Sequence, residues 1–131
     1  MKRSIITTND GSKTIKIEDW NEYYHSTHGA VQEAEHVYIK AGLAYFNLQH
    51  QPQSVNVLEA GFGTGLNALL TCLWSENMDV HVSYTGLEAY PITSEEREAM
   101  DYAGVIVQDS AQKIYHQLHS IEWETTHELS S

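Results

Sequence analysis

The sequence predicts an α/β fold built on a pair of parallel strands, and three observations carry this prediction. Residues 55–60 form a short apolar run that leads directly into three alternating glycines at 61–65. A helical pattern follows over 66–75, and a second strand pattern with alternating apolar residues covers 79–87. Strand, glycine turn, helix and strand in this order make a βαβ unit, which is half of a doubly wound sheet.

The residues before this unit predict a hairpin, a loop and a helix. β-Branched residues at 4–8 and 13–17 flank the sequence Asn-Asp-Gly-Ser, a strong turn signal, so an N-terminal hairpin is expected. The polar and aromatic stretch over 20–29 is typical of a loop. From Ala30 onward, apolar residues recur at spacings of three and four, which predicts a helix that Gly42 weakens or ends.

Two further helices and a polar tail are expected after the βαβ unit. Thr93 and Glu96 have the spacing of a capping box, which predicts a helix that runs to about Tyr102. Another helix is expected over 109–119, with its first residue, an aspartate, as the N-terminal cap. The tail from Ser120 onward is polar and shows no strand pattern.

The composition bounds the size, charge and compartment of the protein. With 131 residues the chain holds at most one domain, and its net charge of −11 argues against binding a phosphate backbone. No apolar run approaches the ~18 residues that cross a bilayer, so no membrane association is expected. The single cysteine, Cys72, excludes an intrachain disulfide and suits a reducing environment. We therefore expect a soluble, cytoplasmic protein.

The glycine turn and two acids beside it predict a binding site for an adenosine-containing cofactor. Glycines at alternate positions let backbone N–H groups approach a ligand closely. Glu59 precedes the turn and Glu88 ends the second strand, where open α/β sheets bind ligands and where an acid can hold ribose hydroxyls. The G-x-G-x-G spacing is shorter than the dinucleotide fingerprint, and no G-K-[ST] follows, which excludes a P-loop.

The motifs also resemble a known family. The form E-x-G-x-G-x-G resembles motif I of class I S-adenosylmethionine-dependent methyltransferases. More narrowly, residues 24–38, 58–67 and 87–93 resemble the tRNA 5-methylaminomethyl-2-thiouridine methyltransferases of MnmC/MnmD type. The matching sequences are Y-H-S, G-A, Q-E and H-V-Y in the first segment, L-E-A-G-F-G-T-G-L-N in the second and L-E-A-Y-P-I-T in the third. The resemblance covers residues from about 5 to 129.

This resemblance implies a Rossmann-like class I methyltransferase fold, a methyl donor and an RNA substrate. The donor is S-adenosylmethionine, and the acceptor is the aminomethyl nitrogen of the wobble uridine, position 34, in certain tRNAs. Carried over residue by residue, the glycine turn would hold the donor, Glu59 would orient the turn and Glu88 would hold the ribose. Tyr24 and Glu33 would close over the cofactor. The implied cofactor-binding residues are Tyr24, Glu33, Glu59, Gly61, Gly63, Gly65, Asn67 and Glu88; no catalytic residue is assigned.

The chain also departs from the family pattern. The family continues with two further strands, one followed by an adenine-recognising acid and one carrying a D-x-x-[FY]-x-D-x-F motif. We therefore expect a truncated, incomplete fold, with an N-terminal extension over 1–50 and the first half of the cofactor domain over 51–131. An alternative makes 105–107 a third strand and Asp109 the adenine-binding acid, although the helix cap is favoured. An unpaired sheet edge would favour a homodimer.

Two other functions remain open, namely a nicotinamide-dependent oxidoreductase and a non-catalytic cofactor-binding or interaction module. A metal site is not expected, because His25, His28 and His36 match no metal-binding spacing. For tRNA binding, the chain offers a weak basic patch on the predicted hairpin. Its members are Lys2, Arg3, Lys13 and Lys16.

Overall fold

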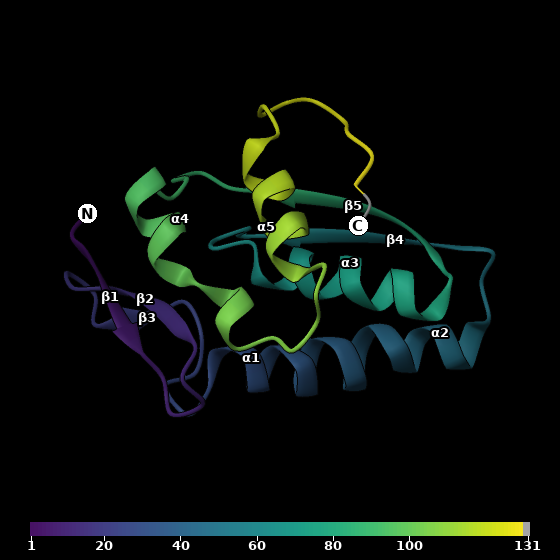
Figure 1. Cartoon of the computed structure of the whole chain (residues 1–131), viewed down its shortest axis with the longest axis horizontal. Coiled ribbons are helices and arrows are strands. Elements are labelled where there is room, and N and C mark those ends of the chain that lie inside the picture. Colours follow the sequence, from purple (N-terminus) through teal and green to yellow (C-terminus); the bar gives the residue numbers. More distant parts are fainter. Residues whose placement is uncertain (130–131) are drawn as a thin grey trace.

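A computed structural model describes residues 1–129 as an α/β arrangement with a helix at its centre (Figure 1). In chain order the elements are β1 (Arg3–Thr7), β2 (Lys13–Ile17), β3 (Glu22–Tyr23), α1 (Ala30–Glu33), η1 (Ala34–Ala44), α2 (Tyr45–His50), β4 (Ser54–Ala60), α3 (Leu66–Met78), β5 (His81–Leu87), α4 (Ser94–Met100), η2 (Tyr102–Gly104) and α5 (Ala111–Ser120). No described helix has the length and apolar character that a bilayer span requires.

The βαβ unit predicted from the sequence is confirmed. Strands β4 and β5 pair in parallel, in a register that runs from Ser54 opposite His81 to Ala60 opposite Leu87. Helix α3 connects them and extends three residues beyond the predicted end. Strand β5 begins two residues later than predicted because Asp79 adopts a left-handed conformation (φ 52°) and caps the helix. The two strands therefore end side by side, next to the glycine turn.

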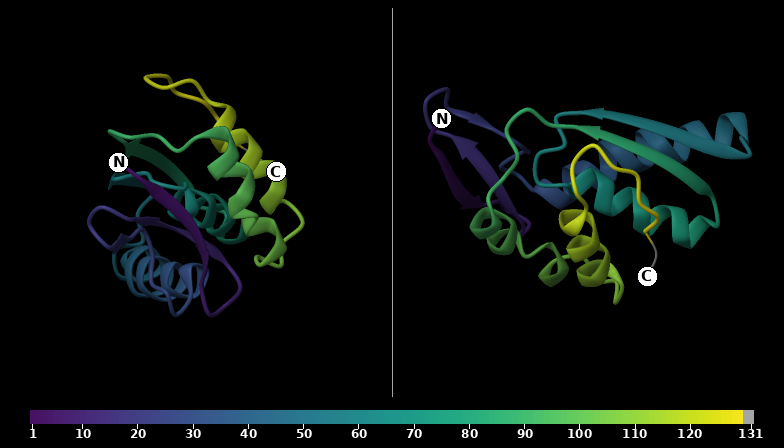
Figure 2. Two further views of the ribbon diagram at one scale, coloured as in Figure 1. Left: turned by 90° about the vertical axis from the view of Figure 1, so that its left-hand side faces the viewer. Right: turned by 90° about the horizontal axis from the view of Figure 1, so that it is seen from above.

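The helix predicted from Ala30 onward is longer than expected. Segments α1, η1 and α2 form one continuous rod that packs along α3 (Figure 2). Gly42 does not end this helix: the N–H of Tyr45 donates to the Gly42 carbonyl, and the rod continues to His50. The central segment η1 is a π-helix, a wider coil than the α-helix. Ala34 and Leu43 are buried within η1, so packing outweighs the local cost of a glycine.

The N-terminal hairpin is confirmed and gains a third strand. β1 and β2 pair antiparallel around the predicted turn, and β2 also pairs with the two-residue strand β3. The prediction that 20–29 is all loop is therefore wrong at β3. This small sheet lies beyond the carboxyl ends of β4 and β5 (Figure 1). It therefore faces the glycine turn, although the two are far apart in the sequence.

The hairpin turn also caps the long helix. Thr8 Oγ1, Ser12 Oγ and Asp10 Oδ2 accept hydrogen bonds of 3.1, 3.1 and 2.9 Å from the N–H groups at positions 30–32. Those N–H groups have no partner within their own helix, and Gly29 at the N-cap has no side chain to supply one. The hairpin is thereby fixed to the start of the helix.

Helix α4 has the predicted capping box. Thr93 Oγ1 accepts from the N–H of Glu96, and the Glu96 carboxylate accepts from the N–H of Thr93. The helix stops at Met100, not at Tyr102, because Asp101 turns left-handed (φ 45°). A short 3₁₀ turn then follows as η2.

The prediction that Asp109 caps the last helix is wrong. Helix α5 begins at Ala111 after Ser110, and the N–H of Ala111 donates to the Gln108 carbonyl instead. The alternative third strand at 105–107 is not formed either. Val105 follows η2, Ile106 is buried and Val107 is fully exposed. The segment is irregular, and only the side chain of Ile106 among these three is buried in the core. No strand occurs in the described part of the tail, 121–129, as predicted.

The core lies around α3, between the long rod and α5. Its buried apolar residues are Ile15, Ala30, Val31, Ala34, Leu66, Leu69, Leu70, Leu73, Met100, Tyr102, Ile106, Ala111, Ile114 and Tyr115. Cys72 packs against this cluster, and burial raises the pKa of its thiol to about 11. Alternate residues of β4 and β5 face outward; among them Leu58 and Leu87 are exposed.

Candidate functional site

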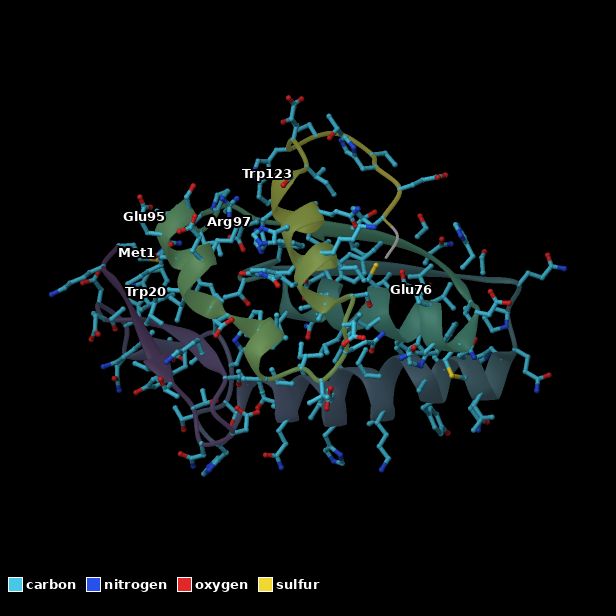
Figure 3. The ribbon with its side chains drawn as sticks, viewed as in Figure 1. Met1, Trp20, Glu76, Glu95, Arg97 and Trp123 are labelled. Carbon is cyan, nitrogen blue, oxygen red and sulfur yellow. The ribbon has the colours of Figure 1, made fainter. Side chains whose placement is uncertain are left out.

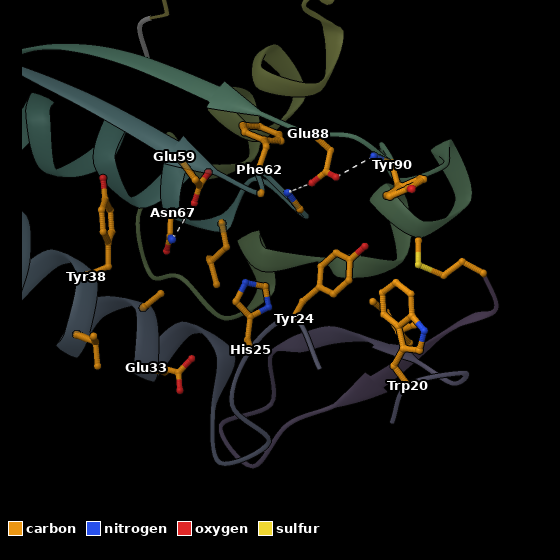
Figure 4. Close-up of a pocket in the computed structure, with 17 residues that line it drawn as sticks. Trp20, Tyr24, His25, Glu33, Tyr38, Glu59, Phe62, Asn67, Glu88 and Tyr90 are labelled. Carbon is orange, nitrogen blue, oxygen red and sulfur yellow. Dashed lines mark hydrogen bonds between the residues drawn. The ribbon is translucent and has the colours of Figure 1, made fainter. Parts of the chain in front are cut away.

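One pocket of about 550 Å³ lies between the small sheet and the carboxyl ends of β4 and β5 (Figure 4). This volume falls in the range of small-molecule sites, roughly 300–1,000 Å³. Both halves of the chain contribute walls. The lining consists of Met1, Ile17, Trp20, Tyr24, His25, Glu33, Ala34, Val37, Tyr38, Glu59, Gly61, Phe62, Gly63, Leu66, Asn67, Glu88 and Tyr90.

The glycine turn forms the floor of this pocket. Gly61, Gly63 and Gly65 have φ angles of +86°, +59° and +80°, which side-chain-bearing residues rarely adopt. The N–H groups of Gly61 and Phe62 donate to the Leu87 carbonyl at 2.8 and 2.9 Å, so the turn is joined to the end of β5. The glycines are therefore required by the backbone path itself.

Glu88 connects the end of β5 to the turn. Its Oε2 accepts from the N–H of Gly63 at 2.7 Å, and its Oε1 accepts from the N–H of Tyr90 at 2.9 Å. A carboxylate oxygen has two lone pairs, so each oxygen keeps one for a further donor. The carboxylate thus faces the pocket in a fixed orientation with acceptor capacity to spare.

Glu59 lies deeper in the pocket and contacts α3, not the glycines. Its Oε2 accepts from Asn67 Nδ2 at 2.9 Å, while its Oε1 is buried beside the hydroxyl of Tyr84. This hydroxyl interacts with the Glu59 carboxyl and with Tyr38. Burial raises the pKa of the Glu59 carboxyl. Each carboxylate oxygen has two lone pairs, so Glu59, which lines the pocket, keeps acceptor capacity for a ligand.

The N-terminal wall comes from β3 and the start of the long rod. The Tyr24 ring packs on the turn so closely that a Cβ at Gly63 would lie 3.2 Å from Tyr24 Cδ2. Glu33 Oε1 accepts from the N–H of Ser26 at 3.2 Å. His25 Nδ1 lies 2.9 Å from Thr14 Oγ1, and burial lowers the pKa of this imidazole, so it is neutral at pH 7.

The lining of the pocket is acidic. It contains the carboxylates of Glu33, Glu59 and Glu88, whereas it includes neither lysine nor arginine within the described residues. Such a surface attracts a cationic ligand and repels an anionic one. The pocket is therefore suited to a ligand with positive charge.

The structure brings seven of the eight predicted cofactor-binding residues to this pocket. The exception is Gly65, which is buried behind the turn as the N-cap of α3. The residues that line it are Tyr24, Glu33, Glu59, Gly61, Gly63, Asn67 and Glu88.

Sequence reasoning missed several aromatic residues of the site. Tyr38 and Tyr90 belong to the motifs that resemble the family but are given no site role there, and Trp20 is placed only in the aromatic stretch; all three line the pocket. Met1 and Trp20 lie together at the N-terminal end of the molecule (Figure 3). A signal was present, because a run of tryptophan and tyrosines in a polar stretch is unusual. Within the described residues, no cluster of metal-binding side chains was found.

Comparison with known proteins gives two kinds of match, although no family model matches the chain. The bifunctional protein MnmC of tRNA 5-methylaminomethyl-2-thiouridine biosynthesis from Magnetococcus marinus is 42% identical over 73 residues, 53% of the chain. The protein of the same name from Leptospira interrogans is 32% identical over 88 residues, 60% of the chain. The matched parts are 11% and 13% of these two relatives, so the chain corresponds to a small fraction of each.

The fold matches a solved structure over nearly its whole length. The crystal structure of MnmC2 from Aquifex aeolicus superposes with a TM-score of 0.68 at 24% identity, covering 95% of this chain and 39% of that one. The α/β fold is therefore shared with that protein. Together with the sequence matches, this confirms the similarity expected from the motifs: the chain resembles a part of the MnmC-type proteins.

Proposed function

We propose that the pocket binds S-adenosylmethionine and that the chain is part of a methyltransferase that acts on tRNA. The observation that carries the proposal is the acidic lining beside a glycine turn at the ends of two parallel strands. S-adenosylmethionine carries a sulfonium and an ammonium cation, which carboxylates attract. A nicotinamide dinucleotide carries a pyrophosphate, which the glutamates would repel. The same reasoning makes the oxidoreductase the weaker alternative.

The residues present fit this cofactor. Glu88 has free acceptor capacity for ribose hydroxyls, and the glycine turn offers backbone at close range. The Glu59 carboxylate, held in place by Asn67 and Tyr84, can accept from the ammonium group with its remaining lone pairs. Tyr24 and Glu33 form the covering wall. Gly65 shapes the turn without lining the pocket. In this proposal residues 51–131 are the first half of a Rossmann-like class I methyltransferase domain and residues 1–50 are an extension that completes its pocket.

The reaction proposed is methyl transfer to the aminomethyl nitrogen of a wobble uridine. S-adenosylmethionine supplies an electrophilic methyl group on sulfur. The chain's own contribution is to hold donor and acceptor in line, which can lower a barrier by several kcal/mol. The attacking amine must be neutral, so its proton has to pass to a base or to water; the chain supplies no assigned base. The acidic pocket attracts the protonated amine of the substrate, which has to lose a proton before it attacks.

The charges of the chain give little support to the proposed binding of tRNA. The net charge is −11. Of the four basic residues on the hairpin, Arg3 pairs with Glu96 at 2.9 Å and Lys16 with Glu18 at 3.0 Å. Binding is therefore expected to be weak, and its salt dependence to be shallow because few cations are available to contact phosphates. A filter-binding titration with unmodified tRNA at low and moderate salt measures it.

Calorimetry tests the cofactor directly. We expect S-adenosylmethionine to release or absorb heat on binding, NAD to give no heat, and Glu88→Ala to weaken binding at least about tenfold. Glu98→Ala is the matched control, since Glu98 is exposed on α4 away from the pocket. Heat with NAD but not with S-adenosylmethionine would favour the oxidoreductase. Binding of S-adenosylmethionine without any methyl transfer to tRNA would favour the non-catalytic cofactor-binding module.

We also propose that the protein is cytoplasmic and that it forms a homodimer through the edges of β4 and β5. Within the described residues these two strands pair only with each other, which leaves both outer edges with unpaired backbone groups. Light scattering coupled to size exclusion measures the mass in solution. A mass of 14.8 kDa at all concentrations would refute the dimer.

A further inference from the structure

Arg3 links the two walls of the pocket, although it is not among the residues that line it. Its guanidinium donates from Nη1 to the Tyr90 carbonyl at 3.1 Å and from Nη2 to the Pro91 carbonyl at 3.4 Å. Nη2 also lies 2.9 Å from Glu96 Oε2 on α4. Arg3 belongs to β1 of the small sheet, whereas these three acceptors follow β5 on the other side of the pocket. The side chain therefore bridges the two walls.

The small sheet is buried at one end and exposed at the other. Near the hairpin turn, Thr8 and Ile15 are buried, and the turn is fixed to the start of the rod. At the open end, Met1 and Trp20 are 53% and 65% exposed. Among residues 1–129, the hydrogen bonds and the ion pair that cross from this open end to the opposite wall all come from Arg3. These polar contacts therefore depend on one side chain.

The contacts of Arg3 continue to residues that do line the pocket. On the small-sheet side, Arg3 interacts with the Tyr24 hydroxyl, and the Tyr24 ring packs on Gly63. On the other side, the residue whose carbonyl Arg3 binds, Tyr90, donates its N–H to Glu88. Tyr24 and Glu88 belong to opposite walls (Figure 4). A change at Arg3 thus reaches both walls.

The chemistry of arginine suits this position. A guanidinium carries five N–H donors in a rigid planar fork and stays protonated over the whole range of ordinary pH. The side chains of Arg3 and Glu96 are only 13% and 16% exposed, so water and salt screen this pair less than an ordinary surface pair. Glu96 Oε2 also accepts from the N–H of Thr93 in the capping box, which fixes the orientation in which Arg3 meets the carboxylate. A lysine ammonium lacks the fork that reaches three acceptors at once.

We propose that Arg3 is a positioning residue that clamps the open end of the small sheet onto the loop after β5 and so sets the width of the pocket. The buried hairpin turn is the fixed end of this arrangement, and loss of the clamp lets the open end move away from the opposite wall. A ligand that contacts both walls then binds less tightly, because binding has to bring the walls together. This consequence for the ligand rests on the proposed function, whereas the clamp itself does not.

The distance between the two walls tests the clamp without any ligand. Spin labels are attached at Glu22→Cys on β3 and Glu98→Cys on α4, both exposed positions, in the full chain. Cys72→Ala removes the only other thiol. Double electron–electron resonance then gives the distribution of distances between the labels. We expect a narrow distribution with Arg3 in place and a broader one, extended to longer distances, in Arg3→Gln. An unchanged distribution in Arg3→Gln would overturn the proposal.

Two further variants separate the clamp from a general effect of charge or folding. Lys16→Gln breaks an ion pair of similar length, 3.0 Å to Glu18, which stays on the small-sheet side of the pocket, so the distribution should remain narrow. Glu96→Gln weakens the clamp from the α4 side, and glutamine still serves in a capping box. It should broaden the distribution even if Arg3→Gln does not fold. Equal broadening in Lys16→Gln and Arg3→Gln, or a narrow distribution in Glu96→Gln, would contradict the clamp.

Calorimetry with S-adenosylhomocysteine, the product of methyl donation by S-adenosylmethionine, measures the consequence for binding. We expect Arg3→Gln to weaken binding about tenfold, Arg3→Lys about threefold and Lys16→Gln less than about twofold. The double variant Arg3→Gln, Glu96→Gln should bind no more weakly than Arg3→Gln alone, because both changes break the same clamp. Saturating ligand should narrow the distance distribution of Arg3→Gln again.

The two measurements fail in distinguishable ways. Unchanged affinity in Arg3→Gln, despite a broadened distribution, would refute the positioning role and leave the proposed function standing. If the unaltered protein binds no S-adenosylhomocysteine, the proposed function is refuted, and the distances between the spin labels alone decide whether Arg3 clamps the walls.

Discussion

The imidazole of His119 donates a hydrogen bond from Nε2 to the backbone carbonyl of Thr64, over 2.9 Å. A carbonyl oxygen can only accept, so Nε2 carries the proton. The bond joins the end of α5 to the middle of the glycine turn. The Phe62 ring meets His119 edge-on at 6.0 Å, and a Cβ at Gly65 would lie 3.2 Å from Nε2. The turn is therefore held from behind by a helix about 55 residues further along the chain.

Replacing His119 should loosen the turn without touching the pocket. We expect His119→Ala to lower the free energy of unfolding by about 1–2 kcal/mol and to weaken S-adenosylmethionine about fivefold, since a hydrogen bond to a buried carbonyl is lost. Chemical denaturation and calorimetry measure the two effects. His116→Ala, at an exposed site on the same helix, should change neither. Unchanged ligand affinity in a destabilised His119→Ala would mean that α5 supports the fold only.

Asp10 should make stability depend on pH. Burial alone would raise its pKa, but hydrogen bonds from Ser12, Gln32 and Thr8 lower it below the ordinary value of 3.8. A carboxyl whose pKa falls on folding stabilises the protein above that ordinary value, and the contribution is lost as pH falls through the folded pKa. Asp10→Ala should therefore cost about 1 kcal/mol at pH 7, and less as the pH drops below 3.8.

Thermal unfolding of Asp10→Ala and of the unaltered protein, at several pH values, measures this difference. Asp109→Ala is an informative control, because Asp109 is exposed and does not cap α5. An Asp109→Ala variant as unstable as Asp10→Ala would contradict the placement of the α5 start. A pH-independent effect of Asp10→Ala would contradict the role of its charge.

Much of the fold could be predicted from local signals, and the two main errors have different physical causes. The hairpin, β4, α3, β5 and the α4 capping box all depend on short-range patterns, and all are present. The helix continues through Gly42 because of distant packing, since the rod is held by its contacts with α3. The error at Asp109 has a local cause: Ser110 is the N-cap of α5, and the Ala111 N–H donates to the nearby Gln108 carbonyl.

Replacing Glu59 by glutamine should stabilise the fold and weaken binding of the ligand. Because its folded pKa is raised by burial, its ionised form opposes folding, and the cost grows as pH rises above the ordinary value of 4.5. We expect Glu59→Gln to raise the melting temperature at pH 7–8 and to weaken S-adenosylmethionine at least about tenfold. The gain in stability should shrink toward pH 4.5 and below.

The measurements are scanning fluorimetry across pH and calorimetry at pH 7.5. Glu98→Gln removes an exposed charge and should leave both unchanged within about 0.5 kcal/mol. A Glu59→Gln variant that is less stable at neutral pH would show that the carboxylate contributes to folding and is not kept for a ligand.

Adding a methyl group at Gly63 tests how closely the glycine turn and the Tyr24 ring approach each other. A Cβ there would meet the Tyr24 ring at 3.2 Å, and φ is +59°. We expect Gly63→Ala to weaken S-adenosylmethionine at least about tenfold and to destabilise the fold by about 1–2 kcal/mol. Gly11→Ala also sits at positive φ (+86°) but meets no atom within 4 Å, so it should lose stability yet keep ligand affinity. Equal ligand affinity in both variants would refute a binding role for this turn.

The candidate site was predictable from two signals, the strand ends and the family motifs, and the motifs alone indicated Tyr24, Glu33 and Asn67. The turn, Glu59 and Glu88 come directly from the βαβ pattern. Tyr38 on the rod and His25 just after β3 reach the pocket because these segments pack opposite the glycine turn. Packing between elements far apart in sequence produces no periodic pattern in the sequence. Gly65 was correctly expected in the turn, although its place is behind the pocket.

The double anchoring of Glu88 has an entropic consequence. A glutamate that is free in solution samples many rotamers, and binding a ligand would have to freeze them at roughly 0.5–1.5 kcal/mol. Here the N–H groups of Gly63 and Tyr90 have already selected one rotamer during folding. A ligand that donates to this carboxylate therefore meets it in place, and the affinity it gains is not diminished by ordering the side chain.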